Sequence, residues 1–441
     1  VRAKVVVPEL EDYNPAAAQE AVVVAGKARF TVLTSRLVRM EYDEDEMFED
    51  AATLAIVNRN LPVPSYTSET TSEGLLRIIT EHLILTYQTG QPFTGDSLRV
   101  VAVSLDPVLT FADWNPSQTN NDVRNLLGTI RSLDLEGAIS LNCTDTSGTM
   151  VNGESLHCEW GLISRDGWAV VNDTDNWSLS PAGWWGSPNV DDLDLYLFAY
   201  GLDFKQAIND FTLVGGKVPL PPRTATGIWF TRWENMADHT VRSIVENYRI
   251  HSLPLDVFVW DMNFHTKQDW TGYSWDRRLY PKPEELTSYL HSLNLLTSCN
   301  LHDNDGVRAS ETMYEEMAEA NGLDPTTGET VPFSVLNETY MISLEDVVLA
   351  NLEQDGMDFF WIDWQQGGTG GGAAGGKQNP TIWLNRMRCT DSIRRGKTTK
   401  RDLVLARFGG LGNHRYQLGF SGDVADVSWE NLAYQPYFSS T

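Results

Sequence analysis

Residues Met357–Gly367 read M-D-F-F-W-I-D-W-Q-Q-G, and this stretch decides the fold of the second half of the chain. From its first residue to Ile362, every side chain except that of Asp358 is apolar or aromatic. A continuous apolar run is typical of a parallel β-strand that is covered on both faces. The carboxylate of Asp363 stands where this predicted strand ends.

An amphipathic helix is predicted directly upstream, at Ser343–Asp355, because apolar residues from Leu344 to Leu352 recur at helical spacing. Gly356 follows and is expected to end the helix. Helix, glycine, buried strand and terminal carboxylate form one unit of an α/β barrel, in which a carboxylate at the carboxyl end of a strand faces the active site. Taken alone, Asp363 could equally cap the following turn.

The composition excludes some functional classes. The chain has 441 residues, enough for two or more domains. Its net charge of −27 argues against nucleic acid or an anionic membrane as a partner, since both need a basic surface. No apolar run approaches the roughly 20 residues of a membrane span. We expect no metal or cofactor, because the cysteines lack metal-ligand spacing and no phosphate-binding motif is present.

The cysteines and the glycosylation sequons bear on the cellular compartment. Cys143 and Cys158 could bridge a hairpin in an oxidising compartment, and two buried free thiols are the open alternative. Asn-x-Ser/Thr triplets occur at Asn142, Asn172, Asn176 and Asn337. They favour a secreted or endomembrane location over the cytoplasm. The oligomeric state stays open.

The first half of the chain is predicted to be β-rich. Arg29–Tyr42 and Gly74–Tyr87 each show the alternation and central turn of a hairpin. Many short strands with turn residues between them indicate a β-sandwich. A helical stretch at Phe204–Leu213 leads to the Gly/Pro-rich segment Gly215–Pro222, which predicts a domain boundary between residues 1–214 and 215–441.

In the second half, strands and helices alternate, which implies a parallel sheet with helical crossovers. Six strands are predicted where a closed (β/α)8 TIM barrel has eight, so we expect an incomplete barrel or an open sheet. The predicted strands are Ala225–Thr231, Leu255–Asp261, Leu295–His302, Met357–Ile362, Leu403–Arg407 and Tyr416–Asp423. We interpret His265, His302 and His414 as structural, because no metal-binding motif surrounds them.

Carboxylates at three of these strand ends indicate the chemistry. Asp261, Asp363 and Asp423 should meet on one face of a barrel. Paired carboxylates are what glycoside hydrolysis needs, one to attack or stabilise the sugar cation and one to protonate the leaving oxygen. Nearby aromatic residues could form the walls of a sugar pocket or simply fill the core; they are Trp229, Trp233, Trp260, Trp270, Trp361, Trp364 and Phe420.

Taken together, these segments resemble glycoside hydrolase family 31. W-I-D-W-Q-Q at Trp361–Gln366 resembles the family's nucleophile motif Trp-x-Asp-x-Asn-Glu, and G-F-S-G-D at Gly419–Asp423 resembles its acid/base motif. L-P-L-D-V-F-V-W-D at Leu253–Asp261 is similar to its third-strand region. The sequence departs from the pattern where Gln365 and Gln366 replace Asn and Glu, and where Phe420 replaces Trp.

The resemblance implies roles for individual residues. Asp363 would be the nucleophile and Asp423 the general acid/base of a double displacement, with their carboxyl groups about 5 to 5.5 Å apart. The charge of Asp363 would then raise the pKa of Asp423 and keep it protonated. The residues expected to bind substrate are Asp261, Arg407, Trp361, Trp260, Phe420 and Trp364.

The function implied is that of a retaining, exo-acting α-glycosidase, an α-glucosidase that acts on oligosaccharides. A transglycosylase, α-xylosidase, α-galactosidase or α-glucan lyase on the same fold remains open, as does an inactive carbohydrate-binding protein. The family's barrel continues past the position of Asp423. We therefore expect this polypeptide to be a fragment that is poorly stable or inactive alone, because an open barrel exposes strand edges.

Overall fold

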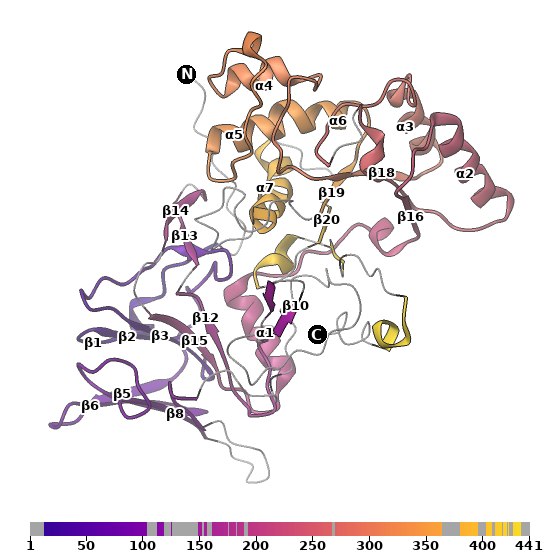
Figure 1. The fold of residues 1–441 in the computed structure, drawn as a ribbon. Coiled ribbons are helices and arrows are strands. Elements are labelled where there is room, and N and C mark those ends of the chain that lie inside the picture. Colours follow the sequence, from indigo (N-terminus) through magenta and orange to yellow (C-terminus); the bar gives the residue numbers. More distant parts are fainter. Residues whose placement is uncertain are drawn as a thin grey trace.

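The computed structural model shows a β-sandwich beside a parallel sheet that is lined by helices (Figure 1). It describes residues 13–103, 113–118, 125, 149–151, 154–156, 161–174, 176–181, 183–188, 193–266, 270–363, 380–395, 403–407, 411–416, 418–420, 422 and 427–433.

Two five-stranded antiparallel sheets form the sandwich. The first has the order β1 (Val22–Ala25), β2 (Ala28–Val32), β3 (Leu37–Tyr42), β15 (Leu193–Phe198), β12 (Ala169–Asn172). The second has the order β5 (Tyr66–Thr70), β6 (Leu75–Thr80), β7 (Leu83–Gln88), β8 (Leu98–Ala102), β9 (Asp113–Trp114). In a smaller three-stranded sheet, β13 (Trp177–Leu179) lies between β4 (Ala52–Thr53) and β14 (Trp185–Pro188). In a further two-stranded sheet, β10 (Thr149–Val151) pairs with β11 (Glu154–Leu156). The predicted β-sandwich is confirmed.

Strand alternation gives the first sheet two different buried faces. Phe30 and Met40 face the second sheet and pack with Leu85 and Tyr87 in a common apolar core. Their chain neighbours Arg29 and Glu41 point to the other face of the sheet. There they lie directly opposite one another in the pairing of β2 with β3. Every residue of both strands is nevertheless buried. The second face must therefore satisfy its charges within the protein.

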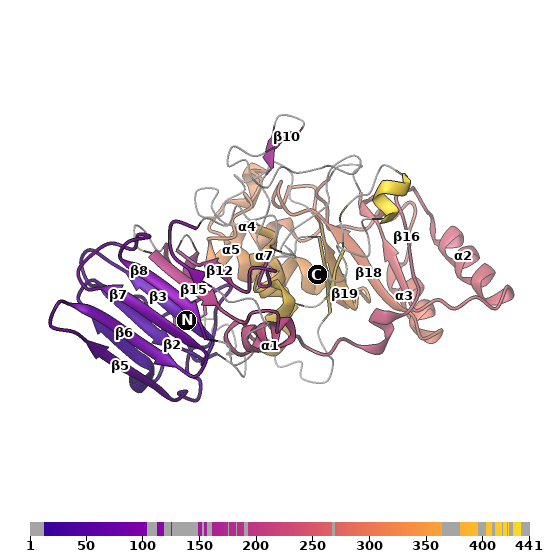
Figure 2. The ribbon, with the colours of Figure 1, turned by 90° about the horizontal axis from the view of Figure 1, so that it is seen from below.

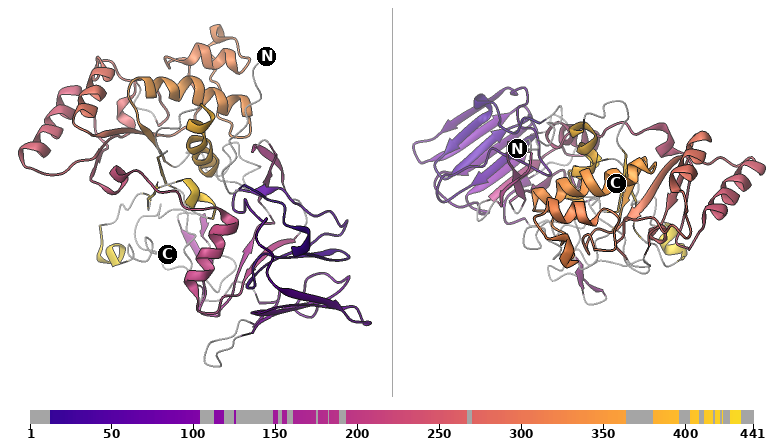
Figure 3. Two further views of the ribbon diagram at one scale, coloured as in Figure 1. Left: turned by 180° about the vertical axis from the view of Figure 1, so that it is seen from behind. Right: turned by 90° about the horizontal axis from the view of Figure 1, so that it is seen from above.

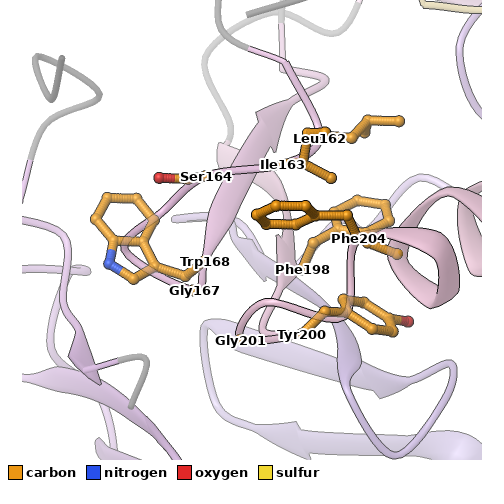
Figure 4. A pocket seen from close by; sticks show the side chains of 10 residues that line it. Leu162, Ile163, Ser164, Gly167, Trp168, Phe198, Tyr200, Gly201 and Phe204 are labelled. Carbon is orange, nitrogen blue, oxygen red and sulfur yellow. The ribbon is translucent and has the colours of Figure 1, made fainter. Parts of the chain in front are cut away.

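Helix α1 (Phe204–Gly215) joins the sandwich to the second half, and the Asp203 side chain caps its first turn. Between α1 and β15 lies a small hollow lined by Phe198, Tyr200 and Phe204 (Figure 4). Its volume of about 10 Å³ leaves space for one water molecule at most. This cavity is therefore no substrate site.

The second half builds a six-stranded parallel sheet that curls into a half-barrel (Figure 2). Its order is β16 (Trp229–Arg232), β17 (Val257–Trp260), β18 (Leu296–Leu301), β19 (Phe359–Ile362), β20 (Val404–Ala406), β21 (Leu418–Gly419). The helices are α2 (Asp238–Ile250), α3 (Pro283–Ser292), α4 (Tyr314–Ala320), α5 (Glu338–Ser343), α6 (Ala350–Gln354) and α7 (Pro380–Arg394). The predicted incomplete barrel is confirmed, and each predicted strand appears in the expected order. No helix in the described ranges has the length and apolar character to cross a membrane.

The two faces of the parallel sheet have separate apolar clusters. Phe258, Trp260 and Phe360 belong to the large cluster that includes the inward sides of the helices. Val259 and Trp361 belong to a small cluster made almost entirely of strand residues, on the concave inner face. Because side chains alternate along a strand, neighbouring residues in these strands point to opposite faces.

The helix predicted at Ser343–Asp355 is real but irregular. It begins earlier, with α5, and continues through a π-helical turn at Leu344–Leu349 into α6. The wider turn places Glu345 in the buried face together with its apolar neighbours. Regular helical spacing could not reveal this residue, which we had not singled out. Gly356 ends the helix as predicted, at φ +105°.

The sandwich and the half-barrel are in direct contact (Figure 3). Arg415 donates hydrogen bonds to the carbonyl oxygens of Leu54 and Gly215, and Arg386 donates to that of Gly183. Both arginines are buried. They donate hydrogen bonds to carbonyl groups that are cut off from water where the sandwich contacts the half-barrel and that would otherwise have no partner.

Candidate active site

The candidate site lies where β17, β18 and β19 end. Each strand is followed at once by a polar residue: Asp261 after β17, His302 after β18 and Asp363 after β19. The strands are parallel neighbours in register, with Leu301 opposite Ile362. Because parallel strands end at one edge of the sheet, these three side chains come together there, as the barrel architecture predicts.

Asn300 joins two of the carboxylates. Its Nδ2 atom lies 2.9 Å from Asp261 Oδ1 and 3.0 Å from Asp363 Oδ2, and donates to both. Asn300 precedes His302 by two positions, so both side chains share the inner face of β18. One amide thus fixes the spacing of two acids that would otherwise repel one another.

Asp363 is held as a carboxylate. Arg407 Nη1 contacts its Oδ1 at 2.5 Å, and His302 Nε2 lies 3.2 Å from its Oδ2. Burial opposes the charged form, since Asp363 is only 5 % exposed. The close imidazole and the Arg407 guanidinium outweigh this effect and lower the pKa of Asp363 to about 2. The group is therefore ionised at any physiological pH.

Asp261 has the opposite tendency. Its burial raises its pKa, with the negative charge of Asp363 acting in the same direction. Hydrogen bonds from the backbone N–H of Met262, at 2.7 Å, and from Asn300 work against that rise. Two neighbouring acids with pKa values driven apart are a mark of functional sites, because they can take different roles.

Aromatic rings border this cluster on the inner face. The rings of Trp361 and Phe420 meet edge to face with centroids 5.4 Å apart, and Arg407 lies over the Phe420 ring at 5.8 Å. On the other side, Trp270 contacts His302 at 5.5 Å between ring centroids. The predicted site residues Asp261, Arg407, Trp361 and Phe420 are thus brought to the end of the sheet that carries Asp363.

Trp260 needs a correction. We expected it to contact substrate together with Asp261, but its ring is 1 % exposed and packs edge to face against Trp275 and Phe258 in the helix-facing core. The physical reason is strand alternation, since adjacent residues of β17 point to opposite faces. Trp260 therefore supports the sheet from behind and does not line the inner face.

Asp423 and Trp364, which complete the predicted site, lie outside the described residues. The predicted separation of Asp363 from Asp423 therefore stays a prediction. Cys143 and Cys158 also lie outside them, so their predicted bridge is untested. Cys299 and Cys389 are free and buried.

Sequence reasoning missed Asn300 and did not count His302 among the site residues. No motif marked Asn300, and we had interpreted His302 as structural. Their spacing contained the signal, because Asn300 and His302 are two apart at the end of a strand that is a neighbour of the Asp363 strand. Within the described ranges, no group of three or more His, Cys, Asp or Glu side chains is arranged to hold a metal ion.

Several solved structures share this architecture. The chain superimposes on the Flavobacterium johnsoniae GH31 dextranase complexed with glucose with a TM-score of 0.65 and 15 % identity, covering 95 % of this chain and 57 % of the dextranase. It matches a GH31 α-xylosidase from a soil metagenome, complexed with xylose, with a TM-score of 0.62 and 14 % identity, covering 95 % and 68 % of the two chains. At such low identity, these matches establish the fold.

Sequence comparison agrees with the structural one. An α-xylosidase of Saccharolobus solfataricus is 22 % identical over 301 residues, which cover 62 % of this chain and 39 % of that protein. An α-xylosidase of Lactiplantibacillus pentosus is 29 % identical over 140 residues, 29 % of this chain and 18 % of its own length. The alignments thus span less than half of these relatives. The model of the glycosyl hydrolases family 31 TIM-barrel domain matches residues 218–438, half of the chain. The chain belongs to glycoside hydrolase family 31.

Proposed function

We propose that this chain carries the catalytic centre of a retaining glycosidase for α-linked sugars. The observation that carries the proposal is the state of Asp363, a buried carboxylate at a barrel strand end whose pKa is lowered to about 2. A carboxylate that attacks a sugar carbon must be ionised, and one of its oxygens must be able to reach that carbon. Arg407 contacts one oxygen of Asp363, and Asn300 the other.

The proposed reaction is a double displacement. An oxygen of Asp363 attacks the anomeric carbon, the glycosidic oxygen leaves with a proton, and water then hydrolyses the glycosyl ester with net retention. We assign the proton transfers to Asp423 on its motif alone. We assign to Asp261, which accepts hydrogen bonds from Met262 and Asn300, the role of accepting hydrogen bonds from sugar hydroxyl groups.

For specificity, we propose an exo-acting α-glucosidase, with an α-xylosidase as the second candidate. The curated α-xylosidases favour the second candidate, and an α-glucosidase of Bacillus thermoamyloliquefaciens, 30 % identical over 98 residues, favours the first. The two substrates differ only in the hydroxymethyl group on C5 of glucose. A hydrophobic wall distinguishes such small groups by about 1 to 3 kcal/mol, so both sugars must be tested.

The first experiment measures the full chain against p-nitrophenyl α-D-glucopyranoside and p-nitrophenyl α-D-xylopyranoside, and repeats it with Asp363→Asn. Where the chain turns over either substrate, we expect an α-configured first product in the NMR spectrum and a loss of about 10⁴-fold or more in the variant. Product analysis also separates hydrolysis from transfer and from lyase cleavage, which yields an unsaturated anhydrosugar.

A covalent label tests the nucleophile directly. A 2-deoxy-2-fluoro-α-glycosyl fluoride should leave one sugar on the peptide that contains Asp363, detectable by mass spectrometry, and Asp363→Asn should not be labelled. Sugar binding by calorimetry with neither label nor turnover would instead support the inactive carbohydrate-binding alternative and contradict the proposal.

The acid/base assignment has its own test. Asp423→Ala should hydrolyse a p-nitrophenyl glycoside, which needs little acid assistance, far better than a disaccharide. Added azide should accelerate the variant and give a glycosyl azide of retained configuration. If azide has no effect while Asp363 is labelled normally, the role of Asp423 is wrong and that of Asp363 stands.

A further inference from the structure

Behind the candidate site lies a buried cluster of charges that the proposed reaction does not use. Asp303, the residue after His302, is 0 % exposed. Its Oδ1 accepts a hydrogen bond from Tyr273 Oη at 2.7 Å, and its Oδ2 accepts one from Arg388 Nη2 at 3.1 Å. Strand alternation explains the arrangement, because Asp303 points away from the inner face on which His302 lies.

Arg388 contacts both strands that carry the site. It extends from α7 with its side chain only 2 % exposed, and it pairs with Asp303 at the end of β18. Its guanidinium carbon also lies 5.6 Å from the centre of the Phe360 ring. Phe360 belongs to β19, three residues before Asp363, and faces the helices. A single side chain therefore contacts both the end of β18 and the body of β19 from the side of the sheet that faces the helices.

Glu345 is the second carboxylate near Arg388, on the π-helical turn, with its Oε1 3.6 Å from Arg388 Nε. Burial raises the pKa of Glu345 to about 8, against the opposing charge of Arg388. Glu345 therefore holds a proton at neutral pH, and Asp303 is the carboxylate that lies closer to the Arg388 guanidinium, at 3.1 Å against 3.6 Å. The cluster thus directs the arginine charge toward the strand end.

We propose that Arg388 is a positioning residue that sets the approach of His302 to Asp363 by fixing Asp303 at the end of β18 against β19. This inference rests on the proposed function in one respect, which is that Asp363 is taken as the reacting group. Burying a charged pair costs several kcal/mol for each ion, and apolar packing would stabilise the same contact at least as well. The ion pair differs from apolar packing in that it fixes the orientation of the Asp303 carboxylate, because a guanidinium holds a carboxylate in a defined geometry.

The test compares Arg388→Met with Arg395→Met. Both variants remove a cation, Arg388 from the middle of α7 and Arg395 from the residue just after its end. Arg395 pairs with Glu353 and Asp391 and does not contact β18 in the described contacts. The first measurement follows the Asp363 carboxyl carbon by NMR in protein labelled with [¹³C]aspartate, using Asp363→Asn to assign the signal. It needs no substrate, so it succeeds or fails independently of the proposed function.

We expect the wild-type signal and that of Arg395→Met to show no titration midpoint above pH 3. In Arg388→Met the midpoint should rise above pH 3, because His302 is no longer held against Asp363. Where the protein turns over a glycoside, kcat should fall about 10- to 100-fold while KM changes less than about 3-fold. An unchanged midpoint in a folded Arg388→Met protein would overturn the proposal.

Two further variants separate position from charge. Asp303→Asn with Arg388→Met leaves no unpaired ion, and the midpoint should stay raised if position matters. If the midpoint of Asp363 in this double variant returned to the wild-type value, the unpaired charge of Asp303 would have caused the shift seen in Arg388→Met. That result would overturn the proposal. Tyr273→Phe removes one hydrogen bond from Asp303 without a change of charge, and serves if Arg388→Met does not fold. It should move the midpoint in the same direction by a smaller amount.

Discussion

Two of the buried clusters of charged residues in the described part of the chain, one in the sandwich and one at the barrel strand ends, are built differently. In the sandwich, Arg39 donates two hydrogen bonds to the two oxygens of Asp194, at 2.8 and 2.6 Å, and Arg29 donates two to Glu41, both at 2.7 Å. In the barrel, the single guanidinium of Arg407 contacts one oxygen of Asp363. Asp194 and Glu41 in the sandwich are thus each bound by a bidentate arginine, whereas different side chains bind the two oxygens of Asp363.

The difference teaches how to distinguish a structural ion cluster from a functional one. Bidentate pairs use the carboxylate oxygens for structure and leave little for a ligand. At the strand ends, Asn300 is shared between two acids, and the pKa of Asp261 is raised while that of Asp363 is lowered to about 2. Neighbouring acids that share a hydrogen-bond donor and whose pKa values shift in opposite directions indicate groups that can take different roles in a reaction.

The largest effect should come from breaking the sandwich cluster. Arg39→Met would leave Asp194 and Glu41 buried with one cation fewer, and it should lower the free energy of unfolding by about 3 to 5 kcal/mol. Urea denaturation followed by circular dichroism measures this loss. Arg99→Met is the matched control, because its bidentate pair with Asp113 is exposed to solvent and should contribute little to stability. Equal losses in both variants would contradict the comparison.

Breaking the barrel cluster should mainly affect activity. Arg407→Met removes the cation from Asp363, so the pKa of Asp363 should rise and the nucleophile should lose its fixed orientation. We expect kcat/KM to fall about 10²-fold or more, equal to about 3 kcal/mol. The loss of stability should be smaller than in Arg39→Met, because Asp363 can accept a proton in place of its partner. A large loss of stability with unchanged kcat/KM would show that Arg407 is structural.

The dependence of stability on pH offers a third way to separate the clusters. The folded pKa of Asp363, about 2, lies below the usual unfolded value near 3.9, so this group stabilises the fold above the unfolded pKa. Its contribution of about 2 kcal/mol is lost as pH falls, with about half gone between pH 5 and pH 3. Denaturation at both pH values should show a shallower loss for Asp363→Asn than for the wild type. Parallel losses would mean that Asp363 is not strongly paired.

Asp173 in the sandwich should act with the opposite sign. Its burial, with the charge of Asp194, raises its pKa to about 6. A raised carboxyl pKa contributes stability below the unfolded value, and this contribution disappears as pH rises through about 6. Asp173→Asn should therefore remove a gain of stability between pH 6 and pH 4, in the same denaturation series.

The sequence predicted the architecture well because patterns of buried residues determine it. The hairpin at Arg29–Tyr42 and the strand before Asp363 followed from alternation and from continuous apolar runs. It failed at Trp260 because we judged the ring by its neighbour Asp261 and did not apply the alternation that places the two on opposite faces.

Other features depend on contacts that no linear pattern encodes. The π-helical turn that buries Glu345, and the pairing of Asp303 with Arg388 across 85 positions, arise from tertiary packing. Asn300 lay within reach of the same alternation argument, but a single amide carries no motif. Sequence thus predicts which strands end with acids, and the structure shows which neighbours control them.

The smallest expected effect concerns two exposed aromatic rings beside the cluster. Trp233 and Trp270 are 65 % and 43 % exposed, and their rings stack with centroids 6.3 Å apart, at 27°. Because Trp270 contacts His302, which itself lies against Asp363, we expect this pair to border a second sugar unit of the substrate. Trp270→Ala should raise KM for a disaccharide about 5-fold, or about 1 kcal/mol, and change kcat little. Trp429→Ala, which removes an indole that is 82 % exposed on another segment, should leave both constants unchanged. An equal effect in both variants would mean that Trp270 acts through general stability and not through contact with substrate. The difference between the strand ends and the sandwich would then involve only their charged residues and not the aromatic rings beside them.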